Sequence, residues 1–198
     1  RMGTANTSLD LLLAEDDASS MGLAQSLEAH NRERQKLQGS VVDEAMALID
    51  ADQGFQDEHV LVVHGDGWHK GVLGIVASRI ADKYGRPTIV ISINQGLGTG
   101  SARSIEGFPL NEALAHCSGL LEEFGGHKRA AGLKVRHEQI AEFRSRINLF
   151  AKGMISGEPL SPVLEIDCEL PLAQADMELV KILEMLEPHG EGNPAPVF

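Results

Sequence analysis

The sequence predicts an α/β fold preceded by one long helix. Between residues 59 and 153, apolar strand-like runs alternate with amphipathic helical segments. Before them come about thirty-four residues without proline, in which apolar side chains recur at helical spacing. The chain has 198 residues, of which 42% are hydrophobic and only 4% aromatic, so aliphatic side chains must fill its core.

Two helices are expected ahead of the alternating region. Asn6, Thr7 and Ser8 are candidate N-caps for a short first helix. The long helix then covers 18–51 and would measure roughly 50 Å at 1.5 Å per residue. Its middle, "HNRERQK", is polar on every side, which is typical of a helix that bridges two bodies. Gly39 is a weak point of this helix, at which a bend or a break is possible.

The alternating region is predicted to run strand, helix, strand, strand, helix, strand, helix. Runs rich in valine and isoleucine favour strands, and apolar residues three or four apart favour helices. The expected strands are 59–65, 86–92, 97–104 and 129–135, and the expected helices are 70–85, 108–126 and 137–153. Gly85 would cap the first of these helices, and the second would end at Gly125 and Gly126.

The remainder of the chain is expected to hold a strand at 162–170 and a helix at about 175–187. The turn-rich end that follows reads as the first strand of a further domain. The two cysteines, Cys117 and Cys168, are few and far apart, which indicates a reducing, cytoplasmic location. No apolar run approaches twenty residues, and no basic-then-apolar segment opens the chain, so neither a membrane span nor a secretion signal is expected.

Charge is distributed unevenly along the chain. The net charge of −12 argues at first against nucleic acid as a partner. However, residues 59–136 carry a net charge of +3 and five of the eight histidines, while both flanks are acidic. A locally positive cleft attracts a polyanion even when the whole molecule is negative. The centre of the chain is therefore the candidate binding region.

The stretch "EFGGHKRAAGL" places two glycines directly before a histidine and two cations. Gly125 and Gly126 allow the backbone to approach a ligand closely, and their amides can form an anion-binding nest. His127 can donate a hydrogen bond to a phosphate oxygen, and Lys128 and Arg129 add positive charge. The alternative is a helix C-cap followed by a surface histidine.

The stretch "LGTGSARS" surrounds an arginine with two hydroxyls. In a strand, Ser101 and Arg103 share one face because side chains alternate, and Ser104 follows directly. A guanidinium presents a fork that suits phosphate. The alternative is an edge strand with an exposed arginine.

The stretch "HGDGWHKG" joins a strand to a helix through a glycine-rich turn. The free amides at that helix start favour anions, and His69 would cap the turn or contact substrate. Trp68 is expected in the core rather than as a stacking platform. His64 and His69 lack the further ligands that a zinc site needs. The sequence also contains no P-loop, nucleophile elbow or dinucleotide fingerprint.

Several stretches together resemble one enzyme family. "HGDGWHKGVLGIVASRIADKYGRPTIVIS", "GTGSARSIEGF", "EFGGHKRAAGL" and "GEGNPAPVF", with the opening "RMGT" and the "NRERQ" helix, are similar to the RecJ single-stranded-DNA exonucleases of the DHH phosphoesterase superfamily. The match runs over nearly the whole chain, with its motifs in the same order. It implies a mixed-sheet DHH-associated domain with flanking helices, preceded by a long linker helix.

The resemblance also implies how the chain is divided. Residues 1–16 correspond to the end of a DHH domain, 17–56 to the linker helix, and 57–155 to the DHH-associated α/β substrate-binding domain. Residues 156–198 correspond to an extension that leads into an OB-fold missing from this chain. In such proteins the DHH domain binds two Mn²⁺ or Mg²⁺ ions, so no metal site is expected here, and this chain alone would not hydrolyse DNA.

The function implied by the resemblance is 5′-to-3′ degradation of single-stranded DNA in DNA repair and recombination, with this chain as the substrate-binding portion. Gly125, Gly126 and His127 match the family's GGH motif, which holds the substrate phosphate or terminal nucleotide. No catalytic set is complete in this chain, and His127 is its best candidate for a supporting role. Lys128 and Arg129 are candidate DNA-binding neighbours.

The other site residues implied by the resemblance lie earlier in the chain. Ser101, Arg103 and Ser104 match the "SxRS" stretch and would contact the DNA backbone. His69 and Arg79 lie in the "WHxGVxGIVASR" stretch and are further candidates. The family also implies a single-strand-binding protein or helicase as a partner, no membrane, and a monomer.

Two other readings of the sequence stay open. One is a stand-alone module that binds single-stranded nucleic acid without a catalytic partner. The other is a different DHH-family enzyme, such as an oligoribonuclease, a cyclic-dinucleotide phosphodiesterase or a tRNA-editing domain. An Asp-His-His motif upstream of Arg1 would support an enzyme over a binding module.

Overall fold

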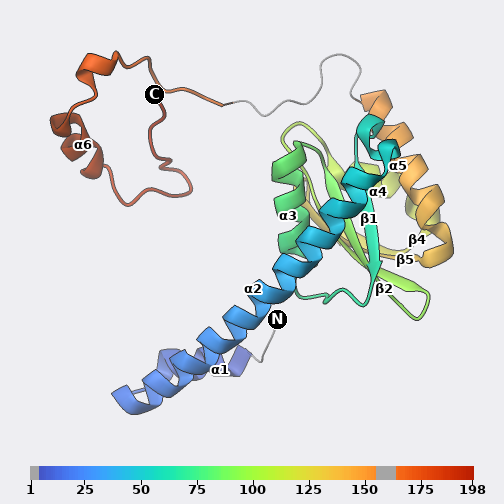
Figure 1. Cartoon of the computed structure of the whole chain (residues 1–198), viewed down its shortest axis with the longest axis horizontal. Coiled ribbons are helices and arrows are strands. Elements are labelled where there is room, and N and C mark those ends of the chain that lie inside the picture. Colours follow the sequence, from blue (N-terminus) through green and yellow to red (C-terminus); the bar gives the residue numbers. More distant parts are fainter. Residues whose placement is uncertain (1–4, 155–163) are drawn as a thin grey trace. The chain divides into compact units, whose positions relative to one another are not determined.

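The computed structural model describes residues 5–154 and 164–198 (Figure 1). The chain divides into two compact units, Arg1–Ser161 and Pro162–Phe198, and each is described by itself. No helix among the described residues combines the length and the apolar character needed to cross a membrane.

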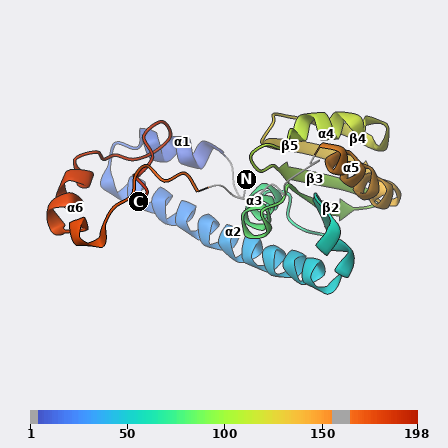
Figure 2. The ribbon, with the colours of Figure 1, turned by 90° about the horizontal axis from the view of Figure 1, so that it is seen from above.

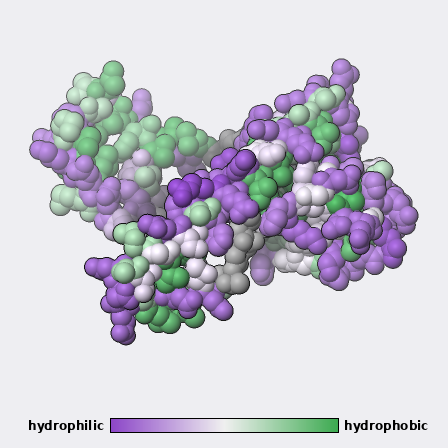
Figure 3. All heavy atoms as spheres, turned by 60° about the horizontal axis from the view of Figure 1, so that its bottom comes forward, coloured by the Kyte–Doolittle hydropathy of each residue, from purple (hydrophilic) through white to green (hydrophobic). Residues whose placement is uncertain are grey.

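The first unit begins with two helices, α1 (Ala5–Leu13) and α2 (Asp17–Ala51). The side chain of Asp16 caps α2 by accepting a hydrogen bond of 2.8 Å from the amide of Ser19. The long helix is thus confirmed, and a 3₁₀ turn (Gln53–Asp57) follows it. Figure 3 shows hydrophilic side chains over much of this face, with one extended apolar group at the upper left and smaller ones elsewhere.

The structure differs from the sequence reading of these helices in one respect and decides another. Residues 6–8 lie inside α1, so they do not precede it as N-caps. The long helix also continues through Gly39 without a break. Val41, Val42 and Ala45 of the next turns are buried against the rest of the unit. That burial stabilises the turns that follow Gly39, although glycine is intrinsically unfavourable in a helix.

A five-stranded sheet forms the centre of the first unit, in the order β1-β2-β3-β5-β4. β1 runs parallel to β2, and the other neighbouring strands are antiparallel, so the sheet is mixed and the predicted α/β class is confirmed. The strands are β1 (Leu61–Asp66), β2 (Thr88–Asn94), β3 (Leu97–Arg103), β4 (Leu121–Gly126) and β5 (Ala130–Arg136).

Helices cover the two faces of this sheet unequally. α3 (Leu73–Tyr84) packs beside α2 on one face, where α3 contacts β2 and β3 and α2 contacts β1 (Figure 2). Gly85 ends α3 in a left-handed conformation, as predicted. α4 (Leu110–His116) and α5 (Ile140–Met154) bury the opposite face. Because the alternating residues of β3 and β5 on the α3 side are only half-buried or exposed, this part of the sheet surface stays accessible.

The helix predicted over 108–126 is wrong in its second half. α4 ends at His116, a 3₁₀ turn (Ser118–Leu120) follows, and β4 then pairs with β5. Apolar spacing alone does not distinguish a short helix and a strand from one longer helix. Pairing with β5 decides the outcome, so Gly125 and Gly126 end a strand rather than cap a helix.

The second unit contains a short 3₁₀ turn (Leu172–Gln174) and α6 (Met177–Glu184), which Asp176 caps with bonds to the amides of Glu178 and Leu179. The helix expected at 175–187 is therefore present but shorter. The predicted strand at 162–170 is wrong within its described part, since residues 164–170 form no strand. Asp167 instead bonds through its backbone amide and its carboxylate to Val197.

Candidate functional site

A pocket of about 470 Å³ lies between α3 and the accessible face of β3. Ser101 and Arg103 enter it from β3 on the same face, as the period of a strand requires. Lys70 enters it from the loop before α3, and so the pocket carries two positive side chains. Its remaining polar lining comes from Ser78 and from the backbones of Gly71 and Gly74.

Arg103 is held in a defined orientation. Its Nη1 donates to the carbonyl oxygen of Ala102 at 2.8 Å and to Oγ of Ser101 at 3.3 Å. Gly74 makes room for the guanidinium, because a Cβ at that position would lie 2.7 Å from Nη2 of Arg103. The Ser-x-Arg pair therefore projects as one unit against the start of α3.

A row of residues without large side chains continues across the sheet from this pocket. Ser101 pairs with Gly132 of β5, which pairs with Gly125 of β4. A Cβ at Gly125 would meet nothing within 4 Å, and one at Gly132 would meet only a carbonyl oxygen 3.9 Å away. Both glycines line a second, smaller pocket of about 270 Å³, beside an ion pair of 2.8 Å between Lys134 and Glu123.

The GGH stretch forms the end of β4 and the turn into β5. Gly126 has φ of +149°, and a Cβ there would lie 2.4 Å from the carbonyl oxygen of Ala130, so only glycine fits. The amide of His127 donates to that carbonyl at 2.8 Å and closes the turn. The side chains of His127, Lys128 and Arg129 are exposed.

The turn of the β4–β5 hairpin lies directly beside the end of β3. The amide of Ser104 donates to the carbonyl of Arg129 at 2.9 Å, and Arg103 pairs with Ala130. The glycine-rich stretches at 97–104 and 123–129 thus lie next to each other in the structure. Arg129 also forms an ion pair of 3.6 Å with Glu106, and both side chains are largely exposed.

The other predicted residues lie around this region with different roles. His69 caps the turn before α3, since its Nδ1 accepts from the amide of Gly71 at 3.1 Å. Ser104 uses its hydroxyl to donate to the carbonyl of Phe108 at 2.7 Å. Arg79 is exposed on α3, outside the residues that line the pocket. Trp68 is buried, as expected.

Several lining residues are not predicted by the sequence patterns. Lys70 and Ser78 join the pocket only because α3 crosses over β3, and Gly132 joins the glycine row through strand register. The spacing of Gly74 and Ser78, four residues apart on one helix face, was the one local signal that could have indicated Ser78.

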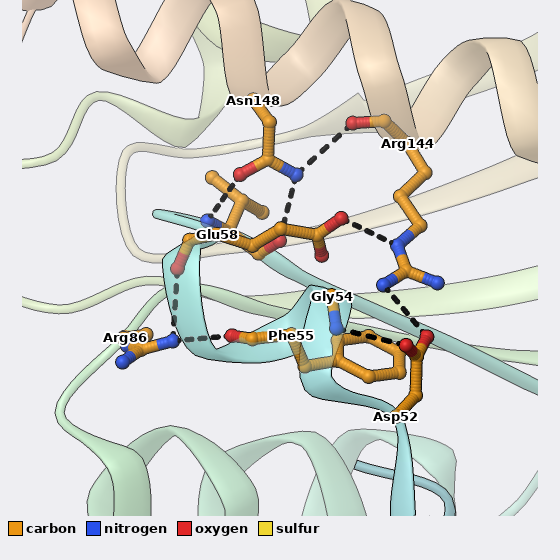
Figure 4. Close-up of polar contacts among 8 residues, drawn as sticks. Asp52, Gly54, Phe55, Glu58, Arg86, Arg144 and Asn148 are labelled. Atoms are coloured by element: carbon orange, nitrogen blue, oxygen red, sulfur yellow. Dashed lines mark hydrogen bonds and ion pairs between the residues drawn. The ribbon is translucent and has the colours of Figure 1, made fainter.

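Another cavity, of about 510 Å³, lies between β1 and α5 on the other side of the sheet. Arg144 bonds to Glu58 at 2.7 Å and to Asp52 at 3.3 Å, and its guanidinium stacks on Phe55 (Figure 4). Burial raises the pKa of Glu58 despite that partner. Burial, and then the neighbouring His137, lower the pKa of His64.

Potential metal ligands do not cluster in the described part of the chain. Across residues 5–154 and 164–198, no three His, Cys, Asp or Glu side chains gather closely enough to hold an ion. The pocket lined by Lys70, Ser101 and Arg103 presents cations and hydroxyls instead of such a ligand group.

The chain is similar throughout its length to known exonucleases. It is 38% identical over 198 residues to the single-stranded-DNA-specific exonuclease RecJ of Bacillus subtilis, covering 99% of this chain and 25% of the relative. It is 33% identical to the RecJ of Thermus thermophilus, covering 100% of this chain and 28% of that protein. The chain thus spans about a quarter of the length of these curated relatives.

Solved structures match in the same way. RecJ from Thermus thermophilus in complex with Mg²⁺ aligns with a TM-score of 0.82 at 33% identity, over 98% of this chain and 30% of that one. An exonuclease RecJ bound to manganese aligns with a TM-score of 0.65 at 32% identity, over 76% of this chain and 37% of that one. The DHHA1 domain family model matches residues 57–153, and the RecJ OB domain model matches residues 166–198. On these matches, the chain belongs to the RecJ family.

Proposed function

We propose that this chain is the substrate-binding portion of a 5′-to-3′ single-stranded-DNA exonuclease. The observation that carries the proposal is the pocket in which Arg103, Ser101 and Lys70 converge beside the glycine row. A forked guanidinium, a hydroxyl and an ammonium together form a phosphate-binding set. The relatives that match this chain over its whole length are themselves single-stranded-DNA-specific exonucleases.

Beyond this pocket, the accessible surface of the sheet offers room for the DNA strand to continue. Gly132 and Gly125 leave the surface shallow, so a sugar or base can lie against the backbone. The exposed turn of His127, Lys128 and Arg129 adds donors beside the end of β3. In this proposal Arg103 and Ser101 bind a backbone phosphate, and the GGH turn holds the neighbouring nucleotide.

In this proposal, the described residues bind and orient the DNA strand. Hydrolysis is assigned to other residues of the full protein. Solved RecJ structures contain Mg²⁺ or Mn²⁺, and divalent ions activate water and offset charge on a phosphate. We assign these ions to a DHH domain of the full protein. Orientation of the strand by fixed cations lowers the entropic part of the barrier.

The experiment that tests this proposal measures binding of a fluorescein-labelled oligothymidylate by anisotropy. Arg103→Ala and His127→Ala should each weaken binding, by about 1–3 kcal/mol for Arg103 because a charged hydrogen bond is lost. Arg146→Ala, on α5 across the sheet, is the charge-matched control. Wild-type affinity in Arg103→Ala, or equal losses in the Arg146 control, would contradict the assigned pocket.

Salt provides a second test of the same proposal. Phosphate contacts release counterions, so the logarithm of the affinity should fall linearly with the logarithm of the salt concentration. Arg103→Ala should reduce that slope by about one contact. A flat salt response would show that the basic centre of the chain does not bind the strand.

Further parts of the proposal rest on the family resemblance alone. They are roles in DNA repair and recombination, a cytoplasmic location, a monomeric state, and a single-strand-binding protein or helicase as partner. A nuclease assay of this chain beside the full-length protein, with Mn²⁺ present, tests the assignment of hydrolysis. Activity of this chain alone would overturn it.

A further inference from the structure

The loop before α3 is fixed at several points, and one of them lies on α2. Trp68 is buried, and its indole Nε1 donates to Oε2 of Glu44 at 2.9 Å. Glu44 itself is exposed on α2. This bond links residues 24 positions apart.

The indole ring is also seated on the sheet. Gly65 at the end of β1 has no side chain, and a Cβ there would lie 2.3 Å from the ring of Trp68. The carbonyl of Trp68 accepts from the hydroxyl of Ser92 at 2.6 Å, and the amide of Gly67 bonds to the carbonyl of Ile93 at 3.1 Å. The backbone of residue 68 is therefore fixed to β2, while its side chain reaches α2.

Lys70 lies two residues beyond this anchor and lines the pocket with Arg103. One residue, His69, separates Trp68 from Lys70, and its Nδ1 accepts a hydrogen bond from the amide of Gly71, which fixes this turn. A shift of Trp68 is thus carried to Lys70 and Gly71 with little chain to absorb it. The bond from Glu44 limits such a shift by holding the indole edge.

We infer that Glu44 on α2 is a positioning residue for the phosphate pocket, acting through Trp68 on Lys70. This inference rests on the proposed function, because it concerns affinity at the pocket assigned there. Glu44 bonds to Trp68 and lies outside the residues that line the pocket, so its effect on binding is indirect. Through Glu44, α2 thereby influences the affinity of the pocket for a DNA phosphate.

The test measures affinity of the 198-residue chain for a fluorescein-labelled oligothymidylate of about 12 nucleotides. Glu44→Ala should weaken binding by about three- to tenfold, the usual scale for one lost hydrogen bond. Glu44→Gln keeps an acceptor oxygen and should restore most of the affinity. Asp43→Ala is the matched control, since Asp43 is an exposed acid directly beside Glu44 on α2.

A double-mutant cycle with Lys70→Ala separates positioning from a general loss of stability. If Glu44 acts through Lys70, the double variant binds no more weakly than Lys70→Ala alone. Additive losses, or a Glu44→Ala variant with wild-type affinity, would overturn the inference while the proposed function stands. Absence of binding by the wild-type chain would overturn both. A lower melting temperature in Glu44→Ala with unchanged affinity would assign Glu44 a structural role only.

Discussion

The guanidinium of Arg103 occupies the space that a side chain on Gly74 would need. A Cβ on Gly74 would lie 2.7 Å from Nη2 of Arg103 and 3.2 Å from Oγ of Ser101. Glycine at position 74 thus leaves room for the side chains of Arg103 and Ser101 against the start of α3.

Gly74→Ala should therefore weaken strand binding without unfolding the chain. The methyl group displaces the end of a flexible side chain, which is a small structural cost, and alanine favours a helix over glycine by about 1 kcal/mol. We expect a loss of affinity of about fivefold or more, because Arg103 leaves its orientation. Anisotropy with an oligothymidylate measures the affinity, and circular dichroism follows the melting temperature.

Gly39→Ala is the control for that substitution, and it carries a prediction of its own. A Cβ at Gly39 meets nothing within 4 Å, in the middle of α2. We expect about 0.5–1 kcal/mol of added stability in urea unfolding, from the lower backbone entropy of the unfolded chain, and unchanged strand affinity. A destabilised Gly39→Ala variant would show that the helix depends on flexibility there.

Gly126→Ala should have the opposite effect on stability. Its φ of +149° is unfavourable for alanine, and the methyl group would meet the carbonyl oxygen of Ala130 at 2.4 Å. Because backbone rather than a flexible side chain blocks the methyl group, the β4–β5 turn must open, at a cost of about 1–3 kcal/mol. Urea unfolding measures this, and Gly125→Ala, with open space around it, serves as the comparison.

Asn148→Ala should destabilise the first unit by about 1–3 kcal/mol, because it leaves buried backbone groups without partners. The carboxamide of Asn148 accepts from the amide of Val60 at 2.9 Å and donates to its carbonyl at 3.0 Å, and Val60 is fully buried. The measurement is urea unfolding, with faster hydrogen exchange at Val60 as a local readout. Asn111→Ala, at an exposed position on α4, should change neither.

The stability of the chain should fall as the pH drops from about 7 to 5, in part through His64. Burial and His137 lower the folded-state pKa of His64 from its ordinary 6.5. The unfolded chain therefore binds a proton first, and stability present above pH 6.5 is lost on acidification. His64→Gln should flatten the pH dependence of the urea midpoint, and an unchanged slope would contradict the role of His64.

The elements that the sequence predicted best are those with strong local patterns. The spacing of Val72, Val76 and Ile80, with Gly85 behind them, indicates α3, and the run over 88–93 indicates a buried strand. β4 could not be predicted, since "LLEEF" has no strict alternation and becomes a strand only by pairing with β5. Local propensity is overridden there by tertiary contacts.

The sequence predicted which motifs belong to the candidate site, but not how the fold brings them together. Arg103 and the GGH stretch stand out by composition, but their proximity depends on strand order, since β5 lies between β3 and β4. Lys70 carries no local signal that separates it from an ordinary surface lysine. Its place in the pocket follows from the path of α3, which a linear pattern does not specify.

β1 is an outer strand of its sheet, and the side chain of Asn148 meets the backbone just before it. A strand at a border normally offers its free amides and carbonyls to any passing chain. The carboxamide of Asn148 bonds to the amide and the carbonyl of Val60, as the backbone of a neighbouring strand would. This contact shortens the stretch of edge backbone with which another chain could pair, because the groups of Val60 are already bonded.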